Sequence, residues 1–128
     1  MGNQGARVMA MKAKTSDYTI KAGDFGAIFT NEGATGAVIF TLPAAASTTR
    51  GAWVEVFVTD AQNVTVATAT SDTLAVDGDA AADSIAWSTG SHQIGNSARF
   101  ICTGTIWLCQ LYPAATTTTL ATQTIVTN

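Results

Sequence analysis

The chain has 128 residues, of which 47% are hydrophobic and only 12% are charged, and its formal net charge is −3. This length suits one domain that buries most of its apolar surface without a metal or a disulfide. The charged share is about half that of an ordinary soluble domain, so little charge is available to keep the surface away from other proteins. The composition therefore favours a protein that works while assembled with neighbours.

Charge is unevenly distributed along the chain. Residues 1–14 carry Arg7, Lys12 and Lys14 and no acid, whereas the remainder carries three cations and nine acids, which gives about +3 and −6. An acidic body argues against nucleic-acid binding, because phosphate contacts need clustered Lys and Arg. The three cations are candidate contacts with an acidic partner surface, and a solvated terminus is the alternative.

No apolar run approaches the roughly 20 residues of a transmembrane helix. The first residues also lack the continuous apolar core of a signal peptide. We therefore expect no membrane partner and synthesis in a cytoplasm.

The N-terminal part of the chain predicts an arm followed by short strands. Residues 1–16 have no clean period and suggest an extended arm. Three short runs at 18–21, 27–30 and 37–42 are rich in β-branched and aromatic residues, and each is closed by a turn signal. Their spacing predicts a β-meander. The small residues at 44–51 predict a connection with one helical turn.

Two alternating segments follow. Residues 53–59 place Val54, Val56 and Val58 on one face, and the other face is also largely apolar, which predicts a central strand covered on both sides. Residues 64–70 alternate as well, and the turn residues 60–63 between the two segments predict a hairpin.

The next stretch is less regular. We expect a short strand at 74–76, a polar loop at 77–83, a brief strand at 84–87 and a glycine-punctuated loop at 88–96. No helix longer than two turns is expected.

The end of the chain predicts a last hairpin and a tail. The hairpin joins residues 98–103 to 106–112 through a turn at Gly104. Residues 113–128 form either a C-terminal arm or a final edge strand, and the apolar Leu120, Ile125 and Val126 are candidate partner contacts. Termini fray unless something holds them, so we expect neighbouring chains to hold both arms.

Candidate chemistry is sparse. His92 is the single histidine and stands in a Ser/Gly/Gln loop without the neighbours of a hydrolytic triad. A turn at Gly104 places Cys102 opposite Ile106 or Trp107 and Cys109 opposite Arg99 or Phe100. The thiols are then offset too far for a disulfide, so free buried thiols are expected.

Acidic residues offer only weak candidate sites. Asp72, Asp77, Asp79 and Asp83 form the densest group, and turns with solvated acids are favoured over a calcium site because the full loop pattern is missing. Glu55 stands in an apolar strand, where it faces a subunit contact or a turn amide. We expect no enzyme activity, no cofactor and no metal.

Taken together, the elements predict an all-β domain at residues 17–112 between two arms. We expect an antiparallel β-sandwich or β-barrel, jelly-roll-like, of about eight short strands.

The order of these signals resembles that of small all-β virion proteins of tailed bacteriophages, the head-decoration (capsid cement) proteins and related tail-fibre domains. The matching features lie between residues 17 and 112. They are Asp17-Tyr-Thr-Ile, Asp24-Phe-Gly-Ala-Ile-Phe-Thr-Asn-Glu-Gly-Ala, Val38-Ile-Phe-Thr-Leu-Pro-Ala, the strands at 53–58 and 64–66, Ile94-Gly-Asn-Ser and Gly104-Thr-Ile-Trp.

The resemblance implies a structural protein on the capsid surface of a virion. Its partners would be the major capsid protein and further copies of itself, commonly as a homotrimer, and it would stabilise the shell where capsomers meet. The alternative is a structural or receptor-binding β-domain of a tail fibre or baseplate. A receptor-binding domain that recognises sugar would need exposed aromatic side chains. Trp87 and His92 are the only candidates for this role, and Trp87 is expected in the core.

Overall fold

A computed structural model describes residues 8–88, 93–112 and 123–127, the last of these as backbone only. The described chain contains eleven strands and two short 3-10 helices, η1 (Ala22–Asp24) and η2 (Ser47–Thr49). The strands are β1 (Met11–Ala13), β2 (Tyr18–Thr19), β3 (Ile28–Thr30), β4 (Val38–Leu42), β5 (Trp53–Phe57), β6 (Val64–Thr68), β7 (Leu74–Val76), β8 (Asp79–Trp87), β9 (Ser97–Cys102), β10 (Trp107–Tyr112) and β11 (Gln123–Thr127). The all-β class is therefore confirmed, and η2 lies where one helical turn was expected.

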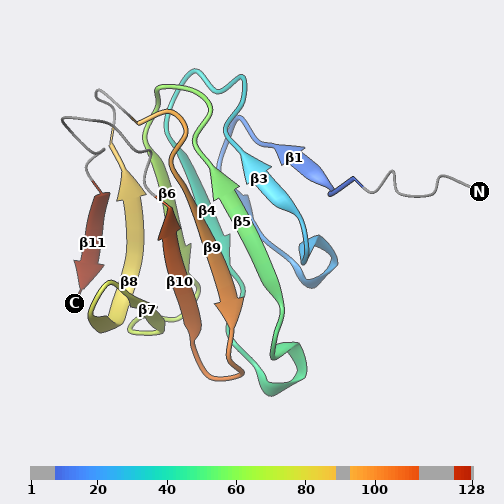
Figure 1. Ribbon diagram of the computed structural model, residues 1–128, viewed down its shortest axis with the longest axis vertical. Helices are drawn as coiled ribbons and strands as arrows, with labels where there is room; N and C mark the ends of the chain where they lie inside the picture. The colour runs from blue at the N-terminus through green and yellow to red at the C-terminus, as the bar shows by residue number, and fades with distance from the viewer. Residues whose placement is uncertain (1–7, 89–92, 113–122, 128) are drawn as a thin grey trace, which may run out of the picture.

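The strands form one strongly curled sheet that folds into two layers (Figure 1). The front layer has the order β1-β3-β5-β9-β10, and β7 joins it to the back layer β8-β6-β4-β2. β11 pairs with β8 at the outer side of the back layer. This arrangement matches the expected sandwich or barrel, although the strand count is eleven rather than about eight.

The first six strands alternate between the two layers along the chain, so they do not form the predicted meander. β1, β3 and β5 lie parallel in the front layer, and β2, β4 and β6 lie parallel in the back layer. The predicted hairpin of residues 53–59 and 64–70 is therefore wrong, because β5 pairs with β3 and β9 while β6 pairs with β4 and β8. Five of the ten strand pairings are parallel, so the expected antiparallel sheet is wrong for half of them.

A buried asparagine explains why the chain crosses between layers after β5. Asn31 is fully buried, and its Oδ1 accepts hydrogen bonds from Thr59 N at 2.8 Å, from Asp60 N at 3.1 Å and from the Thr59 hydroxyl at 3.2 Å. Its Nδ2 donates to Asp60 O at 3.1 Å. The Asn31 amide thus holds the chain after β5 against the chain after β3. Residues 60–63 therefore lead from the front layer to the back layer and do not form a hairpin turn.

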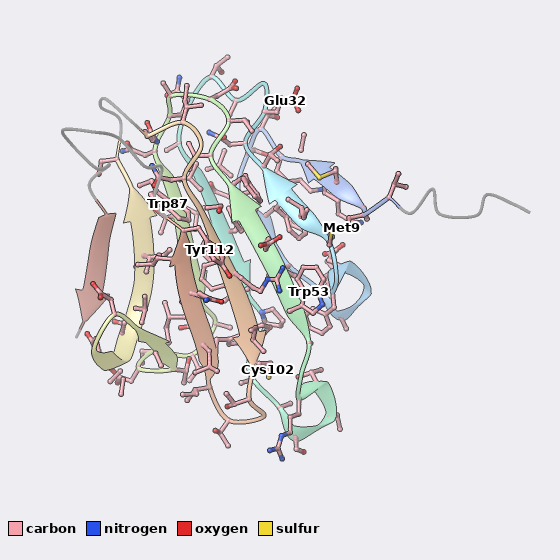
Figure 2. The ribbon with its side chains drawn as sticks, viewed as in Figure 1. Met9, Glu32, Trp53, Trp87, Cys102 and Tyr112 are labelled. Atoms are coloured by element: carbon pink, nitrogen blue, oxygen red, sulfur yellow. The ribbon has the colours of Figure 1, made fainter. Side chains whose placement is uncertain are left out.

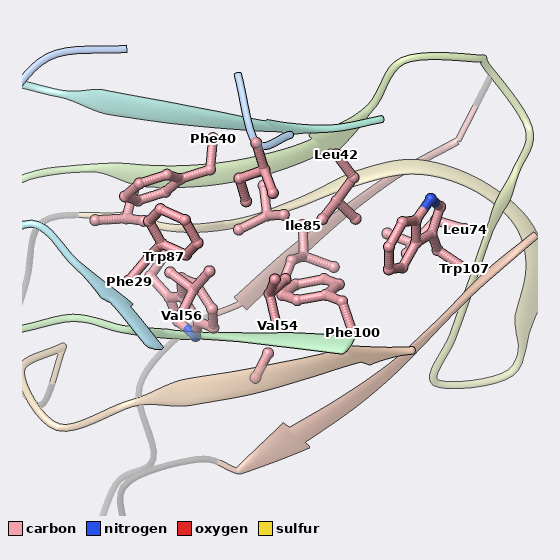
Figure 3. Packing of buried hydrophobic residues seen from close by; sticks show 14 of the residues in the cluster. Phe29, Phe40, Leu42, Val54, Val56, Leu74, Ile85, Trp87, Phe100 and Trp107 are labelled. Atoms are coloured by element: carbon pink, nitrogen blue, oxygen red, sulfur yellow. The ribbon is translucent and has the colours of Figure 1, made fainter. Parts of the chain in front are cut away.

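The core lies between the two layers (Figure 3). Val54, Val56 and Phe100 project inward from the front layer, and Phe40 and Ile85 project inward from the back layer. All five are fully buried, and burying side chains of this size stabilises the fold by roughly 1.5–3 kcal/mol each.

Trp107 fills the region where the layers join. It is fully buried, pairs with Leu74 of β7 and Cys102 of β9, and donates its indole N–H to Pro43 O at 2.8 Å. Its ring lies 6.1 Å from that of Phe25. Trp87 is also buried, as the sequence predicted.

Two segments differ from their predicted structure. Residues 11–13, expected within an extended arm, form β1, because the Met11-Lys12-Ala13 backbone pairs with β3 of the same chain. The expected loop at 77–83 is mostly strand, since Asp77 and Gly78 turn the chain with positive φ and β8 begins at Asp79. Runs of Ala carry too weak an alternation to reveal such a strand.

The last hairpin has the predicted register. Gly104, with φ of +107°, allows the turn, and Thr103 N donates to Ile106 O at 2.9 Å. Cys102 then lies opposite Trp107, and Cys109 lies opposite Phe100. Both cysteines are free, as expected, but only Cys102 is buried, whereas Cys109 is half-buried.

Candidate interaction surfaces

The outer surface of the front layer is rich in large apolar side chains. Because side chains alternate along each strand, the residues between the buried core positions point outward. We define the front face by the outward residues Met11, Ile28, Trp53, Glu55, Phe57, Arg99, Ile101, Leu108, Gln110 and Tyr112. Figure 2 shows Trp53 and Tyr112 on this side of the molecule.

Several of these side chains are open to solvent. Met11 is 62% exposed, Leu108 is 43% exposed and Tyr112 is 40% exposed, while Trp53 and Ile101 are half-buried. Exposed apolar groups that gather in this way mark interaction sites. The expectation that residues 53–59 are covered on both sides is thus wrong for the described chain, because the face of Trp53 and Phe57 lies on the outside.

One ion pair occupies the middle of the front face. Arg99 Nε lies 3.4 Å from Glu55 Oε2, and the two residues are direct neighbours across β5 and β9. The Arg99 guanidinium also lies 4.8 Å from the centre of the Trp53 ring. The Glu55 side chain is only 12% exposed, whereas that of Arg99 is 39% exposed. Glu55 therefore belongs to an ion pair with Arg99 on this surface.

The outer surface of the back layer has a different character. Its outward positions are mainly small and polar, as in Thr41, Thr65 and Ala67. Ile39, which is 41% exposed, is the large apolar exception in β4. The two outer surfaces therefore differ in the size of the apolar groups that they offer to a partner.

A basic corner lies beside β1. Lys12 Nζ lies 3.2 Å from Asp24 Oδ1, and the Asp24 carboxylate also accepts hydrogen bonds from Tyr18 OH at 2.7 Å and from Lys21 N at 3.0 Å. Lys14 Nζ lies 3.9 Å from the centre of the Tyr18 ring, and Lys21 Nζ lies 5.9 Å from it. Lys12 thus pairs with the Asp24 carboxylate, while the Lys14 and Lys21 ammonium groups lie at the Tyr18 ring and make the corner cationic.

Contacts in the basic corner shift the pKa values of two acidic groups, Asp24 and Tyr18. Burial acts to raise the pKa of Asp24, but hydrogen bonds from Lys21 N and Tyr18 together with the Lys12 ammonium outweigh it and hold this pKa below its usual value. The hydrogen bond to Asp24 raises the pKa of Tyr18. Asp24 is therefore an anion at neutral pH, and it anchors Lys12 on its own domain.

The predicted contact residues fall in different places. Lys12 and Lys14 lie together in the basic corner. Ile125 and Val126 lie in β11, so of the two alternatives for the tail, residues 123–127 form an edge strand on β8. Arg7 and Leu120 lie outside the described residues, as does His92.

The aspartates of the acidic group support turns. Asp83 Oδ1 accepts a hydrogen bond from Asp72 N at 2.7 Å, and Asp79 Oδ1 accepts one from Ala81 N at 2.9 Å. Asp72 and Asp77 both have positive φ, which Asp tolerates better than most residues. Within residues 8–88 and 93–112, neither a metal-binding group of three His, Cys, Asp or Glu side chains nor a concave pocket is present.

The two thiols differ in their chemistry. Burial raises the pKa of the Cys109 thiol from 9.0 to about 12. Burial also acts to raise the pKa of Cys102, but hydrogen bonds with Thr49 and Gly104 outweigh it and leave this pKa below its usual value.

We expect the Cys109 thiol to make the protein less stable at alkaline pH. Its folded-state pKa is raised, so its stabilising effect is complete below about pH 9 and is lost as the pH rises towards about 12. Between pH 8 and about 10.5, we expect the free energy of unfolding, measured with urea, to fall further in the wild type than in Cys109→Ala. The additional loss in the wild type should be up to about 2 kcal/mol. Equal losses in the two proteins would contradict the assignment.

Sequence reasoning found the basic residues but missed the front face. Its members come from five strands that are distant in the chain, so pairing had to be known first. One signal was available in the sequence. Residues 53–59 have a second face that is largely apolar, in a chain with few charges, and this combination indicates a surface for a partner. Arg99 and Leu108 gave no signal of their own.

Comparison with known proteins adds no relationship: no protein-family model matches the chain, and no curated protein sequence matches it significantly. In the part of the chain that the structure describes, no helix has the length and apolar character needed to span a membrane.

Proposed function

We propose that this chain is a structural protein of a bacteriophage virion, a head-decoration (cement) protein that binds the outer capsid surface where capsomers meet. The observation that supports this most is the front face, which exposes Met11, Leu108 and Tyr112 in a chain with few charges. Exposed apolar side chains that gather on one face mark a site where a partner binds. An assembly role on the virion, without enzyme activity, provides such partners.

The basic corner supports a contact with the major capsid protein. Lys12, Lys14 and Lys21 present positive charge beside an otherwise acidic body, so they complement an acidic patch on a partner. Symmetry of the shell repeats each contact many times, and neighbours that are already fixed in place raise the effective concentration of the next contact. Weak local contacts thereby become stable attachment.

The test is binding to expanded, undecorated heads of the phage that encodes the chain. We expect saturable co-sedimentation that weakens as salt is added, because Lys contacts are screened. Lys14→Ala should weaken this binding, whereas Arg50→Ala, which removes an exposed cation after η2, should leave it unchanged. Deleting residues 1–7 tests Arg7 without removing β1.

Two outcomes would contradict the proposal. Failure to bind heads at any salt concentration would refute it. Binding to isolated tails or baseplates in place of heads would favour the tail-fibre alternative.

A further inference from the structure

We infer that the front face packs against the same face of a second copy of this chain, around a two-fold axis that runs along the strands between β5 and β9. This inference concerns the surface itself, replaces the homotrimer that the resemblance implies with a two-fold pair, and holds whether or not the chain decorates a head. The face favours a partner because Met11, Leu108 and Tyr112, three of the seven exposed large apolar residues of the described chain, lie on it.

The position of the ion pair identifies the partner as a second copy. In the strand order β1-β3-β5-β9-β10-β7, the Glu55–Arg99 pair lies between the third and fourth strands, at the centre of the layer. A purely apolar partner would cover both charges without replacing their contacts with water, which is costly. A second copy related by the proposed axis places Arg99 of each chain opposite Glu55 of the other, so every covered charge meets an opposite charge.

The geometry of Arg99 leaves it able to make this contact. The Arg99 side chain is 39% exposed, and among the described residues it makes no hydrogen bond beyond the ion-pair contact of Nε at 3.4 Å. Its terminal nitrogens are thus available to a carboxylate that approaches from outside. Arg suits this role because its planar fork binds carboxylates in two-point fashion.

The apolar residues also match under the proposed symmetry. An axis parallel to the strands keeps the strands of the two copies aligned, as in ordinary face-to-face packing of sheets. β5 then faces β9 of the other copy, and Trp53 meets Ile101, its own cross-strand neighbour within the chain. β3 faces β10, which places Ile28 opposite Gln110. Leu108 lies in the row of Trp53 and Ile101, beside this apolar pair. Because the sheet curls, the contact centres on these four strands.

Sedimentation velocity over a range of concentrations tests the inference. We expect the wild type to form dimers and Leu108→Lys to raise the dissociation constant about tenfold or more, since it places a charge in an apolar contact. Ile39→Lys is the matched control, because Ile39 has a similar exposure of 41% on the back layer; it should leave the dimer intact. Thermal unfolding of each variant checks that it folds.

A charge-exchange experiment separates contacts between chains from contacts within one chain. Glu55→Arg and Arg99→Glu should each weaken dimers about tenfold or more, because like charges then face each other. Mixing these two single variants should restore association, since each supplies the charge that the other lacks. A purely internal role for the pair predicts no rescue by mixing.

Several results would overturn the inference. They are a wild type that stays monomeric at all concentrations, a trimer, an oligomer that Leu108→Lys leaves intact, and single variants that mixing does not rescue. None of these results depends on binding to heads, so the proposed virion role can fail independently.

Discussion

Trp107→Ala should lower the free energy of unfolding by about 3–5 kcal/mol and the melting temperature by about 10–20 °C. Trp107 is fully buried where β10 meets β7, so its removal leaves a cavity at the junction of the two layers. The substitution also leaves Pro43 O without the indole N–H that it accepts at 2.8 Å. Thermal and urea unfolding, monitored by circular dichroism, measure the effect.

Two variants make this result specific. Trp107→Phe keeps an aromatic ring near Phe25 and loses the hydrogen-bond donor, so we expect a smaller loss than for alanine. Ile39→Ala removes a large apolar side chain that is 41% exposed and should cost less than about 1 kcal/mol. A loss below about 1 kcal/mol for Trp107→Ala would contradict the described junction.

Asn31→Ala should lower the free energy of unfolding by about 2–4 kcal/mol. The amide of Asn31 is the partner of Thr59 N, Asp60 N and Asp60 O, and alanine leaves these three backbone groups without it. Because these bonds join two corners that are nearly thirty residues apart, hydrogen exchange at Thr59 and Asp60 should also become faster.

The neighbouring residue provides the control for Asn31. Glu32 is exposed, and its backbone N–H, which donates to the Thr30 hydroxyl, remains in Glu32→Ala. We expect this variant to unfold within about 0.5 kcal/mol of the wild type. If Asn31→Ala proved equally harmless, the parallel pairing of β3 and β5 would need revision.

The sequence was informative about strands and less so about their partners. The alternation of Val54, Val56 and Val58 located β5, and Gly104 located the turn that sets the register of Cys102 and Cys109. Local patterns carry such information because side chains alternate along a strand. They do not carry the pairing of β3 with β5, which depends on contacts such as that of Asn31 with Asp60.

The same limit explains the outcome for the interaction surfaces. Lys12 and Lys14 were recognisable because a cluster of cations in an acidic chain is visible in one dimension. The front face required the rows that join Met11, Ile28, Glu55, Arg99 and Gln110 across five strands. A surface assembled from distant strands can be predicted only after their order is known.

The proposed role on the virion rests most directly on where the chain is located in an assembled particle. Cryo-electron microscopy of heads incubated with the purified chain tests this without any substitution. We predict ordered density for the β-sandwich on the outer capsid surface at the junctions between capsomers, with the Lys12 and Lys14 corner towards the shell. Bare junctions at saturating chain, or density confined to the tail, would contradict the account.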